Sequence, residues 1–279
     1  MPTPPRRTRA YITLLSTAAY LPGVACLAAS LQRTGTHVPL VVAVSAGLPA
    51  SARDALAATP GVAQVLALPA DGLLPDWAAQ QEHHWAHTFD KLWLFGLEQY
   101  GKLVYLDSDM VVLQNIDDLF DEPHMAAVAA GRLVNRDWVR LNSGLMVLEP
   151  QAHLPQQIAM TVDMARDEAQ RTGRPAVGDQ DLINMFYADW SREGPHLDQG
   201  DNVFFDHLDA YLDSGLYALP GRAARGAPHR LRVVHFTGRD KPWMPRARLR
   251  NAYALLRGRF GPGQREVLRT YGHLLRRVR

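Results

Sequence analysis

The alternation of strand-like and helix-like segments over the first 70 residues restricts the fold more than any other feature. Apolar runs at residues 10–16, 39–44 and 62–68 are separated by helix-like segments at 22–33 and 51–58. Segments that alternate in this way form βαβ units, in which helices cover both faces of a parallel sheet. No Gly-x-Gly-x-x-Gly motif follows the first run, so the dinucleotide fingerprint is absent. We therefore predict an α/β domain with a mostly parallel central sheet flanked by helices.

The segment from Lys102 to Leu113 carries a candidate metal site. Its apolar run is typical of a buried strand and ends on Asp107 and Asp109, which are separated only by the small Ser108. Open α/β sheets bind ligands outside the carboxyl ends of their strands. Two carboxylates with room left for phosphate oxygens suit a hard divalent cation. The same tripeptide is also common in turns and helix caps, so by itself it leaves both interpretations open.

A second polar group follows the last predicted strand, residues 231–234. If this strand runs parallel to that of Asp107 in the same sheet, His235 meets the two carboxylates at one edge. Two carboxylates and an imidazole favour Mn²⁺, because imidazole is a poor ligand for harder cations such as Mg²⁺. Gly238 permits close backbone approach and Lys241 supplies a point charge, which together suggest a phosphate seat. A structural histidine and an ordinary loop are the alternatives.

Polar residues in three other segments are candidates for ligand contacts. A helix predicted at 89–100, with Thr88 as its N-cap, is apolar nearly all round, so Lys91 needs a partner or an anionic ligand unless its ammonium reaches solvent. Asn142-Ser143-Gly144 and Asp179-Gln180 offer groups that can grip sugar hydroxyls. Taken singly, each of these motifs is more often a turn or a helix cap.

The order and content of these motifs resemble family 8 retaining glycosyltransferases, the group that includes glycogenin and galactinol synthase. The resemblance runs from about Tyr11 to Trp243. It rests on these motifs in order: Ala19-Tyr20 with Gly23 and Ser30-Leu31; Thr88-x-x-Lys91-Leu92; Tyr105-x-Asp107-Ser108-Asp109; Asn115-Ile116-Asp117; Asn142-Ser143-Gly144; Asp179-Gln180-x-Leu182-x-Asn184; and Val234-His235-Phe236-x-Gly238-x-x-Lys241-Pro242-Trp243.

The resemblance implies a fold and an activity. The expected fold is a single Rossmann-like nucleotide-sugar-binding domain of the glycosyltransferase A type over residues 1–245, followed by a helical tail, residues 246–279. The expected activity is retaining transfer of glucose or galactose from UDP-glucose or UDP-galactose to a hydroxyl acceptor, such as a saccharide, a lipopolysaccharide or an inositol-like compound. Retention requires same-face attack or a covalent intermediate, and the sequence does not choose between them.

The resemblance also implies which residues hold the donor. Asp107, Asp109 and His235 match ligands of Mn²⁺, with Mg²⁺ as the alternative, and Lys241 with the backbone of Gly238 matches contacts to the donor diphosphate. The other matched positions are Ser16 and Tyr20 near uracil and ribose, Ser108 between the metal carboxylates, Lys91 close to the donor, and Asn142, Ser143, Asp179 and Gln180 around the transferred sugar. Of these, Asp179, Gln180 and Lys91 are the candidate catalytic residues.

Three departures from glycogenin argue against self-priming. An additional aspartate of glycogenin, three residues before the Asp-Gln pair, is Ala176 here. An arginine ahead of the lysine helix has no match, because that region holds Glu82 and the histidines His83, His84 and His87. The self-glucosylated tyrosine falls near Asp209, with Tyr211 two residues on. We therefore expect transfer to a separate acceptor.

The tail, residues 246–279, has a charge unlike the rest of the chain. It contains ten arginines and one acid, a net charge of +9, which leaves −7 for the remainder of a chain whose total is +2. Apolar residues recur among the arginines at roughly helical spacing. A basic amphipathic helix of this kind binds anionic membrane surfaces. The alternative is that the apolar stripe packs on the catalytic domain and the arginines face solvent.

Two other functions compete with the glycosyltransferase. The arginine-rich tail could bind nucleic acid, but it lacks a recognisable DNA- or RNA-reading motif. A nucleotide-sugar-binding protein without turnover is the second rival. Cys26 is the single cysteine, no run approaches transmembrane length, and the first residues lack a signal peptide's apolar region. We expect a cytoplasmic protein, peripheral at the inner membrane face if the tail binds lipid, and the sequence leaves a homodimer open.

Overall fold

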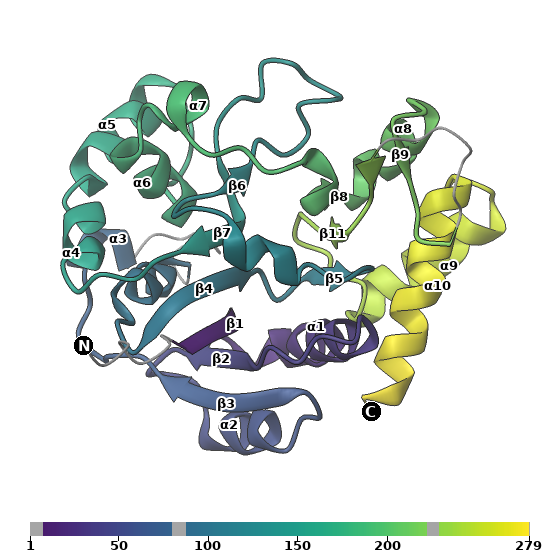
Figure 1. Ribbon diagram of the computed structural model, residues 1–279, viewed down its shortest axis with the longest axis horizontal. Coiled ribbons are helices and arrows are strands. Elements are labelled where there is room, and N and C mark those ends of the chain that lie inside the picture. Colours follow the sequence, from purple (N-terminus) through teal and green to yellow (C-terminus); the bar gives the residue numbers. More distant parts are fainter. Residues whose placement is uncertain (1–7, 80–87, 222–228, 279) are drawn as a thin grey trace, which may run out of the picture.

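A six-stranded sheet organises the structure, a computed structural model that describes residues 8–79, 88–221 and 229–278 (Figure 1). Its strand order is β3–β2–β1–β4–β7–β6. The six strands are β1 (Thr8–Leu15), β2 (Leu40–Val44), β3 (Val62–Ala67), β4 (Tyr100–Leu106), β6 (Ala127–Val128) and β7 (Asn142–Leu148). β1, β2, β3 and β4 pair in parallel, whereas β7 runs antiparallel to both β4 and β6. The prediction of a mostly parallel sheet is confirmed.

Both faces of the sheet are buried, which explains why its central strands are apolar throughout. Successive residues of β1 enter different parts of the core. Ile12 packs in the cluster that contains Phe95, and Tyr11 packs in the cluster that contains Leu27. A strand covered on both faces needs a continuous apolar run rather than an alternating pattern, and the runs at 10–16 and 39–44 have this character.

Helices and 3-10 helices connect and cover the strands. The helices before residue 194 are α1 (Leu21–Arg33), α2 (Ala50–Ala57), α3 (Asp76–Ala79), α4 (Leu154–Ala159), α5 (Val162–Arg171), α6 (Asp179–Phe186) and α7 (Trp190–Glu193). The 3-10 helices in the same part of the chain are η1 (Ala18–Tyr20), η3 (Phe89–Gly96) and η4 (Asp117–Asp121).

The structure corrects two predicted helices. The segment at 89–100 is the shorter 3-10 helix η3, because Tyr100 already pairs with Thr8 as the first residue of β4. Thr88 does not cap η3 with its side chain; its Oγ1 accepts from the Asp179 amide at 3.3 Å. Helical periodicity over residues 155–170 predicts a single helix. The structure interrupts it at Thr161, whose Oγ1 donates to the carbonyl of Ile158 (2.8 Å), a local bond that competes with helix continuation.

A second sheet, with strand order β5–β11–β8, carries the segment that contains His235. It is built from β5 (Met110–Val112), β11 (Val233–His235) and β8 (Val203–Phe204). β11 runs antiparallel to β5 and lies in a different sheet from β4, so the condition of a shared parallel sheet for His235 and Asp107 is not met. The chain turns after β4, where the Met110 amide donates to the Asp107 carbonyl (3.1 Å), and β5 then starts the new sheet. His235 pairs with Met110 and still arrives beside the carboxylates.

Residues 191–230 are rich in Gly, Pro and Asp, which predicts irregular structure, but the structure forms short elements there. They are η5 (Gln199–Asp201), β8, η6 (Phe205–His207), α8 (Leu208–Asp213), β9 (Tyr217–Ala218) and β10 (His229–Arg230). β9 and β10 pair with each other in a separate two-stranded sheet. The sequence missed these elements because each is only two to six residues long.

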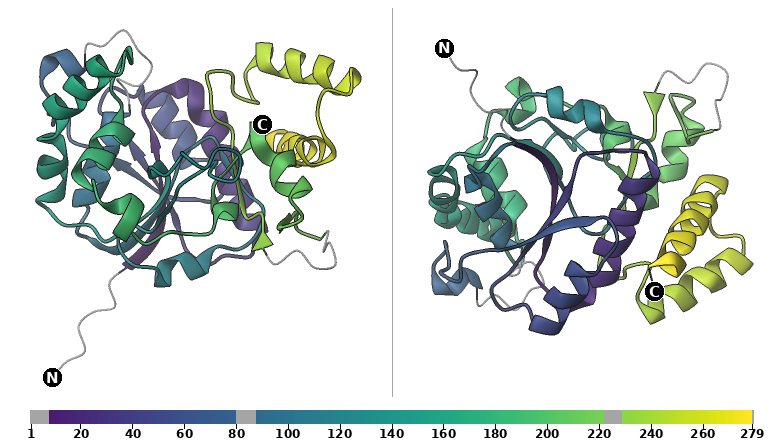
Figure 2. Two further views of the ribbon diagram at one scale, coloured as in Figure 1. Left: turned by 90° about the horizontal axis from the view of Figure 1, so that it is seen from above. Right: turned by 60° about the horizontal axis from the view of Figure 1, so that its bottom comes forward.

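The tail folds into two helices, α9 (Pro245–Leu256) and α10 (Pro262–Arg277), with Arg279 outside the described residues. Figure 2 shows both at one side of the molecule, where α10 lies beside α1. α10 buries four apolar side chains in the cluster that contains Phe236 and Trp243. The four are Val267, Tyr271, Leu274 and Leu275. For α10 the packing interpretation of the tail is therefore confirmed.

α9 differs from α10, because its large apolar side chains stay in solvent. Leu249 is 75% exposed, Tyr253 51% and Leu256 86%. Only Ala247 of this helix is buried. No helix among the described residues is both long and apolar enough to span a bilayer.

Candidate functional site

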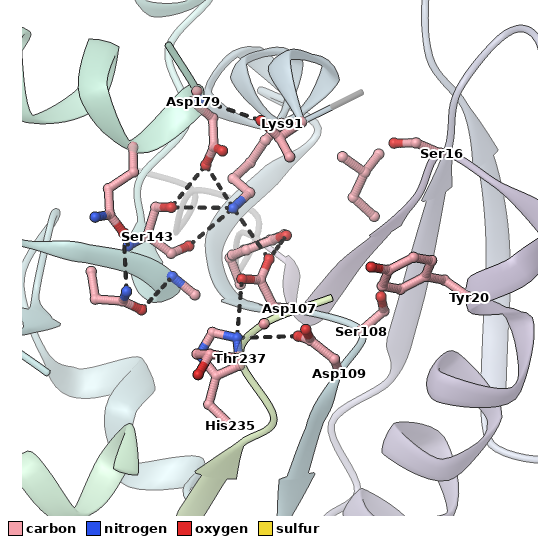
Figure 3. A pocket seen from close by; sticks show the side chains of 18 of the residues that line it. Ser16, Tyr20, Lys91, Asp107, Ser108, Asp109, Ser143, Asp179, His235 and Thr237 are labelled. Atoms are coloured by element: carbon pink, nitrogen blue, oxygen red, sulfur yellow. Dashed lines mark hydrogen bonds and ion pairs between the residues drawn. The ribbon is translucent and has the colours of Figure 1, made fainter. Parts of the chain in front are cut away.

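A cavity of about 620 Å³ opens beyond the carboxyl ends of β1 and β4. All thirteen residues that the sequence predicted as donor or metal contacts line this cavity. Those residues are Ser16, Tyr20, Lys91, Asp107, Ser108, Asp109, Asn142, Ser143, Asp179, Gln180, His235, Gly238 and Lys241. Figure 3 shows ten of the lining residues by name around this space. Glu82, His83, His84 and His87 lie outside the described residues.

Asp107, Asp109 and His235 form a potential metal site at the floor of the cavity. One ligand atom from each lies within 4.8 Å of the others. His235 Nε2 is 3.2 Å from Asp109 Oδ1 and 3.7 Å from Asp107 Oδ2. Two carboxylates with one imidazole form a borderline-hard donor set, which suits Mn²⁺. The residues present therefore fit the ion that the sequence predicted.

Asn202 holds the imidazole of His235 in this orientation and was missed by the sequence reasoning. The side chain of Asn202 is fully buried, and its Oδ1 lies 3.2 Å from His235 Nδ1. Its amide nitrogen donates to Asn142 Oδ1 at 2.8 Å. A fixed partner on the second ring nitrogen is how proteins orient metal-binding histidines. Nothing in the sequence around residue 202 signals this role, because its partners are 33 and 60 residues away.

Gly144 on β7 leaves room for the His235 ring. A Cβ at this position would lie 2.7 Å from His235 Cε1 and 2.8 Å from Met110 Cε. Contacts this short force the neighbours to move, so only glycine fits without displacing the imidazole. The Asn-Ser-Gly motif therefore has a steric role at the metal site in addition to its polar groups.

Lys91 lies at the centre of a buried network beside the metal site (Figure 3). Its Nζ is 2.7 Å from Asp179 Oδ2 and 3.2 Å from Asp107 Oδ1, and it donates to the backbone and side-chain oxygens of Ser143, both at 3.3 Å. It also lies 4.8 Å from the ring centre of Tyr105. Burial acts to lower the Lys91 pKa, but the carboxylates of Asp107 and Asp179 outweigh it and raise the pKa. The expectation that Lys91 needs a partner is confirmed.

Asp179 and Gln180 begin α6 and face the same end of the cavity. Burial acts to raise the Asp179 pKa, but the Lys91 ammonium and hydrogen bonds lower it overall, so the carboxylate stays ionised. Ser143 Oγ donates to Asp179 Oδ2 at 2.8 Å. Gln180 Oε1 accepts from Asn142 Nδ2 (3.0 Å) and from the Ser143 amide (3.1 Å). The four residues predicted to surround a transferred sugar are thus bonded to one another.

The cavity has further lining residues that the sequence did not single out. Arg174, in the loop before α6, forms an ion pair with Asp181 at the mouth near Asp179. Asp181 directly follows the Asp-Gln pair, so its place in the sequence could have identified it as a lining residue. Arg174 carried no local signal, because it lies in a loop without a recognised motif.

Ser16 and Tyr20 lie on the side of the cavity opposite Lys91 (Figure 3). The Tyr20 ring packs edge-on against Trp243, with the two ring centres 5.5 Å apart. Trp243 Nε1 in turn donates to the Ala19 carbonyl at 2.9 Å. Burial raises the pKa of the Tyr20 hydroxyl. The first and last matched motifs of the chain therefore meet at this end of the cavity.

Known proteins share this sequence pattern and fold. The family model for glycosyl transferase family 8 matches residues 11–247. Human glycogenin-1 is 29% identical over 238 residues, which cover 84% of this chain and 62% of glycogenin-1. Inositol phosphorylceramide glucuronosyltransferase 1 from Arabidopsis thaliana is 30% identical over 251 residues, covering 84% of this chain and 42% of the plant protein. The chain thus spans less than two thirds of the length of these curated relatives.

Solved structures agree with the predicted fold. The structure of the galactosyltransferase LgtC in complex with donor and acceptor sugar analogues superposes with a TM-score of 0.59 at 16% identity, covering 94% of this chain and 95% of LgtC. An active-site mutant of LgtC reaches a TM-score of 0.62 with the same coverage. The glycosyltransferase A type fold is confirmed by these likenesses. With the family model matching from the first strand to the start of α9, the chain belongs to glycosyl transferase family 8.

Proposed function

We propose that this chain is a Mn²⁺-dependent retaining hexosyltransferase that moves glucose or galactose from a UDP-sugar to a separate hydroxyl acceptor. The observation that carries the proposal is the convergence of Asp107, Asp109 and His235 with two buried lysines in one cavity. The proposal assigns catalysis to residues 1–245 and, within the tail of residues 246–279, a separate role to α9, because α10 packs into the core. Family membership supports nucleotide-sugar chemistry in general.

The donor would lie across the cavity from Ser16 and Tyr20 to Asp179. When bound at Asp107, Asp109 and His235, Mn²⁺ supplies a Lewis acid that stabilises charge on the departing diphosphate. Lys241 and the backbone at Gly238 add positive charge and a close backbone approach at the same diphosphate. Because Mn²⁺ and Lys241 would neutralise the negative charge of the departing nucleoside diphosphate, the site needs no general acid to protonate this leaving group.

Asp179 and its neighbours would act on the transferred sugar. The anomeric carbon becomes oxocarbenium-like in glycosyl transfer, and an ionised Asp179 close to it stabilises that positive charge. Gln180 and Asn142 would orient the sugar hydroxyls, and Lys91 would hold Asp179 and Asp107 at a fixed spacing. We expect Asp179→Asn to reduce the transfer rate about 10²- to 10³-fold while UDP binding persists. A near-normal rate in this variant would contradict the role of Asp179.

A separate acceptor is supported by the environment of Tyr211. This tyrosine, two residues beyond the position that matches the self-glucosylated residue of glycogenin, has no exposed surface. Its hydroxyl donates to Gln199 Oε1 at 2.7 Å. Asp209 itself accepts from the Gly263 amide at 2.9 Å. Neither side chain lines the cavity, and both belong to α8, which packs against α10.

A donor panel tests the proposed activity. UDP release is measured from UDP-glucose, UDP-galactose and UDP-glucuronate with Mn²⁺ or Mg²⁺, followed by a screen of saccharide, inositol and lipid-linked acceptors. We expect UDP release that depends on Mn²⁺ and is lost in Asp109→Asn but kept in the surface control Asp121→Asn. Donor binding without UDP release would favour the binding protein without turnover.

The exposed face of α9 supports a second part of the proposal, contact with an anionic membrane surface. Leu249, Tyr253 and Leu256 are spaced i, i+4 and i+7 and therefore form one apolar stripe, with Arg246 and Arg257 close to it in angle around the helix. An apolar stripe flanked by cations is what an anionic bilayer surface attracts. A location in the cytoplasm at the inner membrane face follows from this proposal.

Deleting residues 246–279 is unsuitable as a test, because α10 belongs to the core. The sharper variant is Leu249→Ser with Leu256→Ser, which leaves α10 intact. We expect the wild type to co-sediment with phosphatidylglycerol vesicles and the double variant to remain in the supernatant. Met160→Ser with Met164→Ser, at two other exposed apolar positions, is the control. Equal sedimentation of all three proteins refutes the membrane contact, and a salt-dependent shift with DNA would favour the nucleic-acid alternative.

A further inference from the structure

The lysines of this chain are distributed in a way that points to a specific role. The sequence contains 27 arginines and only three lysines, and two of those lysines, Lys91 and Lys241, line the cavity. Both are buried, with 3% and 4% of their surface exposed. Each contacts one of the two carboxylates of the candidate metal site: Lys91 contacts Asp107, and Lys241 contacts Asp109.

The two lysines differ in how firmly they are held. Lys91 has two carboxylate partners and two oxygens of Ser143. Lys241 has one carboxylate partner, Asp109 Oδ2 at 2.5 Å, and donates to the Phe236 carbonyl at 2.9 Å. Lys241 is also carried by the loop after β11, in which Gly238 adopts a positive φ of 87°. Lys91 is therefore tied on several sides, whereas Lys241 depends on the single charge of Asp109.

We propose that Lys241 is a placeholder cation, which neutralises Asp109 until a divalent metal ion binds there and is then transferred to the donor diphosphate. This inference rests on the proposed function. A divalent ion bound by Asp109 repels an ammonium group on the same carboxylate, so the ion and Lys241 compete for Asp109. The diphosphate offers Lys241 a new anionic partner at the moment it loses the old one.

The chemistry of lysine suits this exchange better than that of arginine. An ammonium is a compact point charge on a flexible stem, so it can move from one anion to another by rotating its side chain. A guanidinium is a planar fork that favours a fixed bidentate partner. In a chain that otherwise uses arginine, a lysine at residue 241 fits a group that must change partners.

The exchange makes metal and nucleotide binding interdependent. Mn²⁺ alone binds at a carboxylate that already carries the Lys241 ammonium on its other oxygen, and displacing that ammonium leaves it buried without a carboxylate. Both effects weaken binding of the ion. UDP supplies the replacement partner, so Mn²⁺ binds more tightly in its presence. By thermodynamic linkage, UDP also binds more tightly when Mn²⁺ is present.

Manganese titrations of the wild type and Lys241→Met test the exchange. Free Mn²⁺ is followed by electron paramagnetic resonance without nucleotide and then with saturating UDP, and UDP binding is measured by calorimetry. We expect Lys241→Met to bind Mn²⁺ alone about tenfold more tightly than the wild type and to bind UDP about tenfold more weakly in the presence of Mn²⁺. The factor by which UDP strengthens Mn²⁺ binding should shrink accordingly.

Lys102→Met is the matched control, because Lys102 lies on β4 and pairs with Glu149 away from the cavity. Circular dichroism checks that each variant is folded, and Lys241→Gln serves as a second variant if Lys241→Met is not. Weaker or unchanged binding of Mn²⁺ alone in a folded Lys241 variant would overturn the placeholder role while leaving the proposed function intact. A wild type that binds neither Mn²⁺ nor UDP would overturn both.

Discussion

Two sides of the cavity have different construction. Lys91, Ser143 and Asp179, here called the sheet wall, belong to the six-stranded sheet and the elements packed on it, and each bonds to the other two. His235 and Lys241, here called the loop wall, come from β11 and the loop that follows it, in the second sheet. Both contact Asp109. The sheet wall is therefore cross-bonded within itself, whereas Lys241 of the loop wall has a single carboxylate partner, Asp109.

Lys91→Met gives the largest expected effect and breaks the sheet wall. The variant keeps the length of the side chain but leaves Asp179 and Asp107 without their shared cation. Removing one partner of a buried ion pair costs about 3–5 kcal/mol. We expect the free energy of unfolding in urea to fall by this amount. Lys102→Met removes a lysine that pairs with Glu149 outside the cavity, and it should lower the free energy of unfolding by less than about 1 kcal/mol. Equal losses would show that the sheet wall is not specially stabilised.

Gly144→Ala is expected to push the His235 ring of the loop wall away from β7, the strand that also carries Ser143 of the sheet wall. The new Cβ would lie 2.7 Å from His235 Cε1, so the ring must shift away from Asp109. Overpacking of this kind costs about 1–3 kcal/mol in stability. A misplaced ligand should also weaken Mn²⁺ binding about tenfold in calorimetry.

Gly47→Ala is the matched control for Gly144→Ala, because a Cβ at Gly47 meets nothing within 4 Å. This variant should retain the stability and the Mn²⁺ affinity of the wild type. Unchanged Mn²⁺ affinity in Gly144→Ala would mean that the loop wall can absorb the added methyl group.

The smallest expected effect is the dependence of stability on acid pH. Burial acts to raise the Asp179 pKa, but Lys91 lowers it overall below its usual value. At low pH the unfolded chain therefore binds a proton at Asp179 before the folded chain does. The stabilising contribution is present above about pH 4, the pKa of an unperturbed aspartate, and is lost as the pH falls through the folded pKa.

Urea denaturation between pH 2 and pH 6 measures this contribution. Stability should fall more steeply with acid in the wild type than in Asp179→Asn, which has lost one titrating group. Identical slopes would assign the acid sensitivity to other carboxylates, among them Asp109, whose pKa is lowered by His235 and Lys241 against the raising effect of burial.

Much of the fold and of the site could be predicted because their signals are local. The runs at 10–16, 39–44 and 62–68 are strands, and those of β1 and β2 are buried, as their continuous apolar residues predict. Asp107 and Asp109 adjoin one strand end and Asp179 opens a helix, so short motifs were enough to select residues that the fold gathers into one cavity. The helix at 89–100 was predicted too long, since its length depends on a pairing with β1.

The amino-acid sequence by itself determined the family, the parallel core of the sheet and the identity of the polar residues around the cavity. The tertiary structure decided that β11 joins β5 in a second sheet and that Asn202 holds His235. It also decided that α10 packs into the core while α9 stays exposed. Finally, it brought Lys241 to Asp109, which lies 132 residues away in the sequence. The physical reason is that strand and helix signals arise from neighbouring residues. Partners distant in the sequence meet only when the whole core has packed.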